Sequence, residues 1–221
     1  MKLTLREWQT KIKNKSDLIV QASSVDGSDA WQSFFSIGMS YQFVNAYDIC
    51  NDISKFQIGE HNNTVCCAIS YDTDKRRRED KNINRKVIIS NLEVNGIKNI
   101  NLSPIEYFLS LPSYKFVISP EGNGIDCHRH YEAIMAGCIP IIEKNGLIEN
   151  KYKNLPILYT TDYTEITDEY LNNVYVSMLD KEYDFSSLFI NNYDNNIQSY
   201  IKNCGNAWVN YLCKKNWYIT Q

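Results

Sequence analysis

The sequence has no surplus of positive charge, no long apolar run and little glycine or proline. Its 221 residues carry 23 Lys and Arg against 26 Asp and Glu, a net charge of −3. This balance gives no overall basic field, so we expect neither nucleic acid nor an anionic membrane as partner. No window approaches the roughly 18 apolar residues of a membrane span. The N-terminal MKLTLREWQTKIKNK also lacks the apolar segment of a signal peptide.

The seven cysteines are scattered and form no C-x-x-C pair. An odd number without paired spacing argues against a zinc site and against a disulfide framework. The pattern is typical of a reducing compartment, and we expect a cytoplasmic protein without a membrane span. Hydrophobic residues make up 43% of the chain and aromatic residues 13%, which is ample for a packed core.

Short apolar runs alternate with helical patterns along the chain. Strands are expected at residues 17–23, 64–71, 115–118, 139–142 and 155–159. Helices are expected after the capping residues Thr4, Ser103 and Thr167, from Asp29 onward, and at residues 84–92, 126–136 and 197–211. Residues 84–92 also fit a strand, with helix favoured. The alternation predicts an α/β fold with a mainly parallel sheet. No repeat or Pro/Gly/Ser-rich linker divides the chain, so we expect a single domain over residues 1–221.

Residues 114–142, YKFVISPEGNGIDCHRHYEAIMAGCIPII, hold three of the nine glycines. The SPEGNGI loop lies between a predicted strand and a predicted helix, where ligands bind in parallel sheets. Gly122 and Gly124 are predicted to turn with positive φ and to let a ligand approach the main chain. Asp126 is expected to cap the helix, whose amino end attracts phosphate. The loop is therefore a candidate anion site.

Arg129 and Glu132 share one face of that helix with Ala133 and Ala136, and His128 lies one turn before Glu132. A guanidinium donates bidentately to a diphosphate, and a carboxylate accepts from the vicinal hydroxyls of a ribose. Diphosphate and ribose together describe a nucleotide-sugar, and we expect this face not to be the packed one. The same spacing fits an Arg129–Glu132 salt bridge on a solvent-exposed face, so the residues leave both interpretations open.

His128 and His130 do not predict a metal site. Residues two apart on a helix point roughly 200° apart, so the two rings cannot converge on one ion.

The segment SPEGNGIDCHRHYEAIMAGCIPII resembles the exostosin-type glycosyltransferase signature. That signature is a Ser-Pro-x-Gly-x-Gly-x-Asp loop, then Arg and Glu in a helix, then small-Gly-x-Ile-Pro. Downstream, LPILYTTDYTEIT resembles the strand and Asp-aromatic turn that follow it in such proteins. The resemblance covers about residues 107–175. It implies a GT-B fold, in which two Rossmann-like lobes face each other and the C-terminal lobe holds most of the nucleotide-sugar.

By this resemblance Arg129 holds the diphosphate and Glu132 the ribose. The remaining donor contacts fall on the loop residues Ser119, Pro120, Gly122, Asn123, Gly124 and Asp126. Two features depart from the family: Glu121 stands where the family loop has Arg, and only about 60 residues precede the second strand. We therefore expect a reduced N-terminal part (1–60), a nucleotide-sugar-binding Rossmann-like part (61–180) and a C-terminal helical extension (181–221).

The resulting expectation is a metal-independent glycosyltransferase that moves a sugar from a nucleoside-diphosphate donor to a glycan or other hydroxyl acceptor. Arg129 would offset charge on the departing diphosphate. Asp26 and Asp29 are the candidate catalytic bases, although both residues also fit turn and helix-cap roles. The alternatives are a non-catalytic nucleotide-sugar-binding module that needs a partner subunit or a second copy, and an α/β interaction protein without nucleotide affinity.

The segment after the second strand, DTDKRRRED, allows two further interpretations. Asp72 and Asp74 resemble the metal-binding Asp-x-Asp of the GT-A architecture, but a plain strand-end turn is favoured over a divalent metal. One of Arg76, Arg77 and Arg78 is a candidate diphosphate contact. His61, in a polar loop, is expected to be structural or to face solvent.

Overall fold

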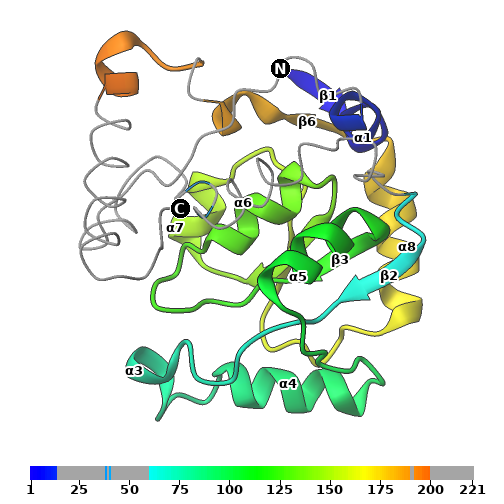
Figure 1. Ribbon diagram of the computed structural model, residues 1–221, viewed down its shortest axis with the longest axis vertical. Helices are drawn as coiled ribbons and strands as arrows, with labels where there is room; N and C mark the ends of the chain where they lie inside the picture. Colours follow the sequence, from blue (N-terminus) through cyan, green and yellow to red (C-terminus); the bar gives the residue numbers. More distant parts are fainter. Residues whose placement is uncertain (14–37, 39, 41–59, 190–191, 200–221) are drawn as a thin grey trace.

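The computed structural model describes residues 1–13, 38, 40, 60–189 and 192–199 (Figure 1). The main elements in chain order are β1 (Lys2–Thr4), α1 (Leu5–Lys13), β2 (Asn63–Cys66), α3 (Lys75–Arg78), α4 (Arg85–Val94), α5 (Pro104–Ser110), β3 (Tyr114–Ile118), α6 (His128–Met135), β4 (Ile139–Glu143), α7 (Gly146–Lys151), β5 (Leu158–Thr160), α8 (Asp168–Leu179) and β6 (Glu182–Asp184). Two 3-10 turns, η2 (Leu111–Ser113) and η3 (Phe185–Leu188), complete them.

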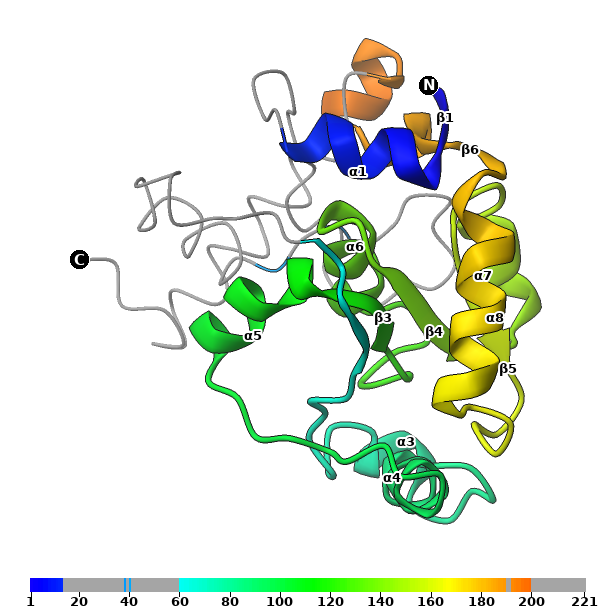
Figure 2. The same cartoon turned by 90° about the vertical axis from the view of Figure 1, so that its right-hand side faces the viewer.

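Four strands form one parallel sheet in the order β2-β3-β4-β5. Its register pairs Val65 with Phe116 and Ile141 with Leu158, while β1 and β6 make a separate antiparallel pair. The predicted α/β class with a parallel sheet is confirmed. Because the strands run in one direction, the loops that follow them meet at one edge. Figures 1 and 2 show α3 and α4 beyond that edge, with β1, β6 and α1 at the opposite end.

The central strands are buried on both faces, as expected for a parallel sheet covered by helices. All five residues of β4 are buried, and Phe116, Val117 and Ile118 of β3 are fully inaccessible to solvent. Helix α6 packs against β4. The apolar runs that predicted these strands therefore form the core behind the SPEGNGI loop.

Local capping chemistry sets the helix starts that the sequence predicts. The Thr4 N–H donates to Glu7 Oε2 at 2.8 Å and the Glu7 N–H to Thr4 Oγ1 at 3.2 Å, a reciprocal capping box at the start of α1. Ser103 and Thr167 cap α5 and α8. Asn84 accepts hydrogen bonds from two backbone N–H groups at the start of α4, so this segment is a helix and not a strand.

Strand β2 is shorter than predicted, because its continuation leaves the sheet for another partner. The Ile69 N–H donates to Asn99 Oδ1 and the Asn99 amide donates to the Ile69 carbonyl, both at 2.9 Å. The Ile100 N–H also donates to the Cys67 carbonyl at 2.8 Å. Residues 67–69 therefore pair with the segment that follows α4.

Helix α1 closes the end of the molecule opposite α3 and α4. The Trp8 indole N–H donates to the Ile134 carbonyl at 2.8 Å, and its ring stacks on Phe185 with centroids 4.4 Å apart. In the described part of the chain, no helix is long and apolar enough to cross a membrane. The strand predicted at 17–23 lies outside the described residues, as do most of the helices predicted from Asp29 and at 197–211. Gly38 and Ser40, which fall within the first of these helices, are described and are not helical, and Gly38 has a φ of 74°.

Candidate functional site

The SPEGNGI loop follows β3 and leads to α6, as predicted, but its glycines differ from expectation. Neither Gly122 nor Gly124 has positive φ; in the described part of the chain the glycines in that region are Gly38, Gly96 and Gly137. A Cβ at Gly122 would lie 3.1 Å from Arg85 Nη2, whereas at Gly124 it would meet no atom closer than 3.7 Å. Gly122 therefore leaves room for the Arg85 side chain, whereas a Cβ at Gly124 would make only ordinary van der Waals contact with the Asp126 backbone.

Asp126 does not cap α6, which corrects the prediction. The N-cap is Cys127, whose side chain makes no capping hydrogen bond. The Asp126 carboxylate instead accepts from the Tyr152 hydroxyl at 2.6 Å and from Lys151 Nζ at 2.9 Å. Asp126 fastens the loop to the end of α7, and the amino end of α6 has no side-chain acceptor of its own.

Arg85 holds the loop from α4, a role that sequence reasoning missed. Its side chain donates to the carbonyls of Glu121 at 2.9 Å, Pro120 at 3.2 Å and Ser70 at 3.3 Å. It forms no ion pair with a described carboxylate. Burial lowers the pKa of Arg85, and the nearby positive charge of Arg129 acts in the same direction. The one available signal was its place just after the Asn84 cap, at the same sheet edge as the loop.

The predicted arginine cluster is divided between protein partners and solvent. Arg77 donates to Glu121 Oε2 at 2.5 Å and to the Gly122 carbonyl at 3.2 Å. Arg78 is buried and forms ion pairs with Asp74 and Glu143. Arg76 is exposed and forms no hydrogen bond or ion pair with a described side chain. The geometry therefore gives Arg77 and Arg78 structural partners in place of the predicted diphosphate.

Glu143, at the end of β4, is the centre of a buried charge network that the sequence did not reveal. Its carboxylate accepts from Arg78 at 2.8 Å, and from the Tyr163 hydroxyl and the Glu121 N–H at 3.1 Å. Arg78 also donates to Asp74 at 2.9 Å. Glu121 stands where the exostosin-type signature has arginine. Its carboxylate pairs with Arg77, and its backbone N–H donates to Glu143.

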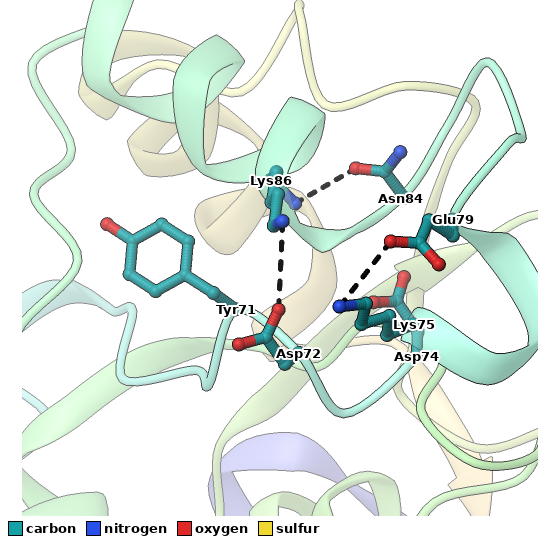
Figure 3. Close-up of a pocket in the computed structure, with 7 residues that line it drawn as sticks. All are labelled: Tyr71, Asp72, Asp74, Lys75, Glu79, Asn84 and Lys86. Atoms are coloured by element: carbon teal, nitrogen blue, oxygen red, sulfur yellow. Dashed lines mark hydrogen bonds and ion pairs between the residues drawn. The ribbon is translucent and has the colours of Figure 1, made fainter.

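Asp72 and Asp74 turn to different partners. Asp74 is buried and accepts from Arg78 and from the Arg85 N–H, both at 2.9 Å, while the exposed Asp72 lies 3.7 Å from Lys86 Nζ. Both line a pocket of about 30 Å³ with Tyr71, Lys75, Glu79, Asn84 and Lys86 (Figure 3). Ligand pockets measure about 300–1,000 Å³, so this one admits water but not a nucleotide. No group of three or more His, Cys, Asp or Glu side chains in the described ranges is placed to hold a metal ion.

Arg129 differs from the other site arginines because none of its donors has a described partner. It forms no hydrogen bond or ion pair with a described residue, and its Nη1 is buried without a partner. The Arg129–Glu132 salt bridge, one of the two interpretations that the sequence left open, is not formed. The guanidinium carbon lies 4.3 Å from the Tyr107 ring centroid, a cation–π contact. Burial lowers the pKa of Arg129, but Tyr107 and Glu132 more than offset this and raise it.

Glu132 lies on a packed face, contrary to expectation. Its side chain is 4% exposed, and Ala133 and Ala136 on the same face are also buried. Glu132 Oε1 accepts from the Ser40 N–H at 3.2 Å, and His128 Nδ1 lies 2.9 Å from the Gly38 carbonyl. The face therefore meets the chain near residues 38 and 40.

The three histidines have structural surroundings. His130 is buried, with Nδ1 2.7 Å from Ser119 Oγ and Nε2 3.3 Å from the Ile125 carbonyl. Burial lowers the pKa of His130, so the ring is neutral, donates to Ile125 and accepts from Ser119. His128 and His130 thus have separate partners. His61 is buried with Nε2 3.1 Å from the Ala136 carbonyl, which confirms its expected structural role.

Asp26 and Asp29, the candidate catalytic bases, lie outside the described residues. Comparison with models of known protein families and with curated proteins gives no match. The exostosin-type resemblance therefore stays a prediction from the sequence.

Proposed function

We propose that this chain binds a nucleoside-diphosphate sugar and transfers the sugar to a hydroxyl acceptor, with Arg129 as the diphosphate ligand. The observation that carries the proposal is the guanidinium of Arg129, which finds no acceptor among the described residues. A buried donor atom such as Arg129 Nη1, left without an acceptor, costs about 1–3 kcal/mol and more in a charged group. Such a cost is understandable where a ligand supplies the missing acceptors.

The charge balance around Arg129 favours an anionic ligand. The side chain of Arg85 donates only to carbonyl oxygens, and neither guanidinium forms an ion pair with a carboxylate in the described part of the chain. Each therefore places a guanidinium without a hydrogen-bonded carboxylate beside the loop. The amino end of α6 adds backbone N–H groups without a side-chain cap. A diphosphate supplies two negative groups to such donors.

The ribose is assigned to Glu132 by the resemblance and by carboxylate chemistry. Its Oε1 accepts one backbone hydrogen bond from Ser40. A carboxylate offers about four acceptor positions, so this bond leaves capacity for the ribose hydroxyls. The contact with Ser40 adds a structural role to the predicted binding role.

The proposed reaction needs charge compensation on the leaving group. The bond between the anomeric carbon and the diphosphate oxygen breaks, and the anomeric carbon bonds to the acceptor oxygen. The acceptor hydroxyl passes its proton to a general base, the role for which the sequence offers Asp26 and Asp29. Arg129 offsets the charge that develops on the diphosphate. The proposal gives this task to Arg129 and not to a metal. The sheet β2–β5 would be the nucleotide-sugar-binding part of a GT-B-type arrangement.

Binding is tested by thermal unfolding with UDP, GDP, CDP and dTDP. We expect at least one nucleoside diphosphate to raise Tm in the wild type and in Arg76→Met, which changes an exposed arginine, but not in Arg129→Met. The same shift in Arg129→Met and in the wild type would refute the proposal.

Transfer is tested separately from binding, with the nucleotide-sugar that matches the preferred nucleotide. Release of nucleoside diphosphate, lost in Arg129→Met, supports a glycosyltransferase. Binding without any release, even with hydroxyl acceptors present, supports the non-catalytic module.

The ribose assignment is tested with Glu132→Gln and two ligands. If Glu132 holds the ribose, the variant binds the nucleoside diphosphate more weakly but binds inorganic pyrophosphate at least as well as the wild type. Equal or tighter binding of both ligands would refute the ribose role, because Glu132 would then act only as a counter-charge to Arg129.

A further inference from the structure

Tyr107 of α5 has a buried hydroxyl without a partner. Its side chain is 6% exposed, and its Oη, together with Arg129 Nη1, is a buried side-chain polar atom that makes no hydrogen bond. Buried tyrosine hydroxyls usually find a partner. In the described part of the chain, the two unpartnered atoms thus belong to two side chains in direct contact, the Tyr107 ring and the Arg129 guanidinium.

We propose that Tyr107 and Arg129 form a two-donor clamp for one anionic group, in which the Tyr107 hydroxyl and Arg129 Nη1 donate to the same phosphate. This inference rests on the proposed function, because the phosphate would be part of the diphosphate of the donor. It adds a binding residue from α5 to a site otherwise built from α4, α6 and the SPEGNGI loop.

The groups around the pair select an anion. Burial raises the pKa of Cys66 to about 11 and that of Cys67 to about 12, so both thiols are neutral at physiological pH. Burial also raises the pKa of Tyr107 well above its usual value, which keeps its hydroxyl a donor. Among the described groups that act on the charge of Arg129, only Glu132 is then negative, while Arg85 adds a second positive charge.

The geometry gives each part of Tyr107 a separate task. The ring supports the guanidinium through the 4.3 Å contact, and the hydroxyl supplies a hydrogen bond. A phenylalanine keeps the ring and removes the donor. Tyr107→Phe therefore tests the hydroxyl alone.

The experiment measures two quantities for Tyr107→Phe: unfolding by urea without ligand, and titration with inorganic pyrophosphate and the preferred nucleoside diphosphate. We expect the unliganded variant to be as stable as the wild type or more stable, because it loses an unpartnered buried hydroxyl. We expect affinity for both ligands to fall about tenfold, the effect of one charge-assisted hydrogen bond. Tyr183→Phe is the control. Tyr183 lies on β6 and its hydroxyl donates to the Met178 carbonyl of α8, so the substitution should leave both affinities unchanged.

The outcomes separate this inference from the proposed function. If Tyr107→Phe binds both ligands as the wild type does while Arg129→Met does not, the clamp is wrong and the proposed function stands. If neither substitution changes affinity, or the wild type binds neither ligand, both are wrong. A Tyr107→Phe variant that is less stable without ligand overturns the clamp whatever its affinity, because the hydroxyl would then have a partner within the protein.

Discussion

Two arginines near the SPEGNGI loop, Arg78 and Arg129, differ in what they contact. Arg78 forms ion pairs with the carboxylates of Asp74 and Glu143. Arg129 forms no hydrogen bond or ion pair with a described residue, and its guanidinium lies over the face of Tyr107. The charge of Arg78 is therefore used by the fold, whereas the unpartnered donor of Arg129 is the feature from which we propose ligand binding.

Arg85 lies between these two extremes. It is buried and has three carbonyl acceptors but no carboxylate. Its hydrogen bonds shape the loop, and its guanidinium forms no ion pair with a described carboxylate. The hydrogen bonds of Arg85 thus position the loop, while Arg129 Nη1, on the helix that follows the loop, has no acceptor among the described residues.

Removing Arg78 should have the largest effect on stability. Arg78→Met leaves Asp74 and Glu143 buried without their cation, and breaking a buried ion pair costs about 3–5 kcal/mol. Urea denaturation at neutral pH measures the loss. Arg76→Met, at an exposed position one residue earlier, should change the free energy of unfolding by less than about 0.5 kcal/mol. Equal effects of the two substitutions would contradict the structural role of Arg78.

Adding a methyl group should destabilise the protein more at Gly122, which faces Arg85, than at Gly124. In Gly122→Ala the new Cβ meets Arg85 and Thr73 at 3.1 and 3.2 Å, so the arginine must shift, at a cost of about 1 kcal/mol. In Gly124→Ala the new Cβ lies no closer than 3.7 Å to another atom, an ordinary contact, so the substitution should cost less. Thermal unfolding of both variants checks the order, and a larger loss in Gly124→Ala would show that the loop packs differently.

Acid should lower the free energy of unfolding through His130, which contacts Ser119 of the loop. Because burial lowers the pKa of this histidine, the unfolded chain binds more protons than the folded one once the pH falls through the usual histidine pKa of about 6.5. The contribution is present at higher pH, and the free energy of unfolding should decline between pH 7.5 and 5.5. His130→Gln should make that decline shallower. An unchanged pH dependence in the variant would assign the acid sensitivity to other groups.

The smallest effect concerns thiol reactivity and leaves stability untouched. Burial raises the pKa of Cys127, beside the start of α6, to about 12, as it does for Cys67. At pH 8 iodoacetamide should therefore leave both cysteines unmodified in the folded protein and label them in urea. Mass spectrometry of the peptides measures this. Rapid labelling of Cys127 in the folded protein would mean that the end of the loop opens.

The sequence predicted elements where short-range chemistry decides them. The Thr4, Ser103 and Thr167 caps and the apolar runs of β3 and β4 act over a few residues, so their patterns are legible without a structure. Strand β2 was predicted too long because its continuation pairs with Asn99, about 30 residues away. Such a partner leaves no local signal in the strand itself.

The candidate site was predicted only in part, for the same physical reason. Helical spacing gave the position of Arg129 and the loop before it. The assignment of Asp126 as a cap was wrong because Tyr152 and Lys151, distant in sequence, compete for its carboxylate. Tyr107 could not be identified either, since its contact with Arg129 joins α5 and α6, which β3 separates in the sequence. Long-range polar contacts decide which charges the fold uses, and single-residue patterns do not encode them.

The proposed function requires that Arg129 binds the ligand and does not stabilise the unliganded protein. The most direct measurement is urea denaturation of wild type and Arg129→Met, each with and without saturating nucleoside diphosphate. Without ligand we predict equal or higher stability for the variant; with ligand, we predict a gain for the wild type alone. A variant that loses as much stability as Arg78→Met, or that gains as much from the ligand as the wild type, would contradict the claim.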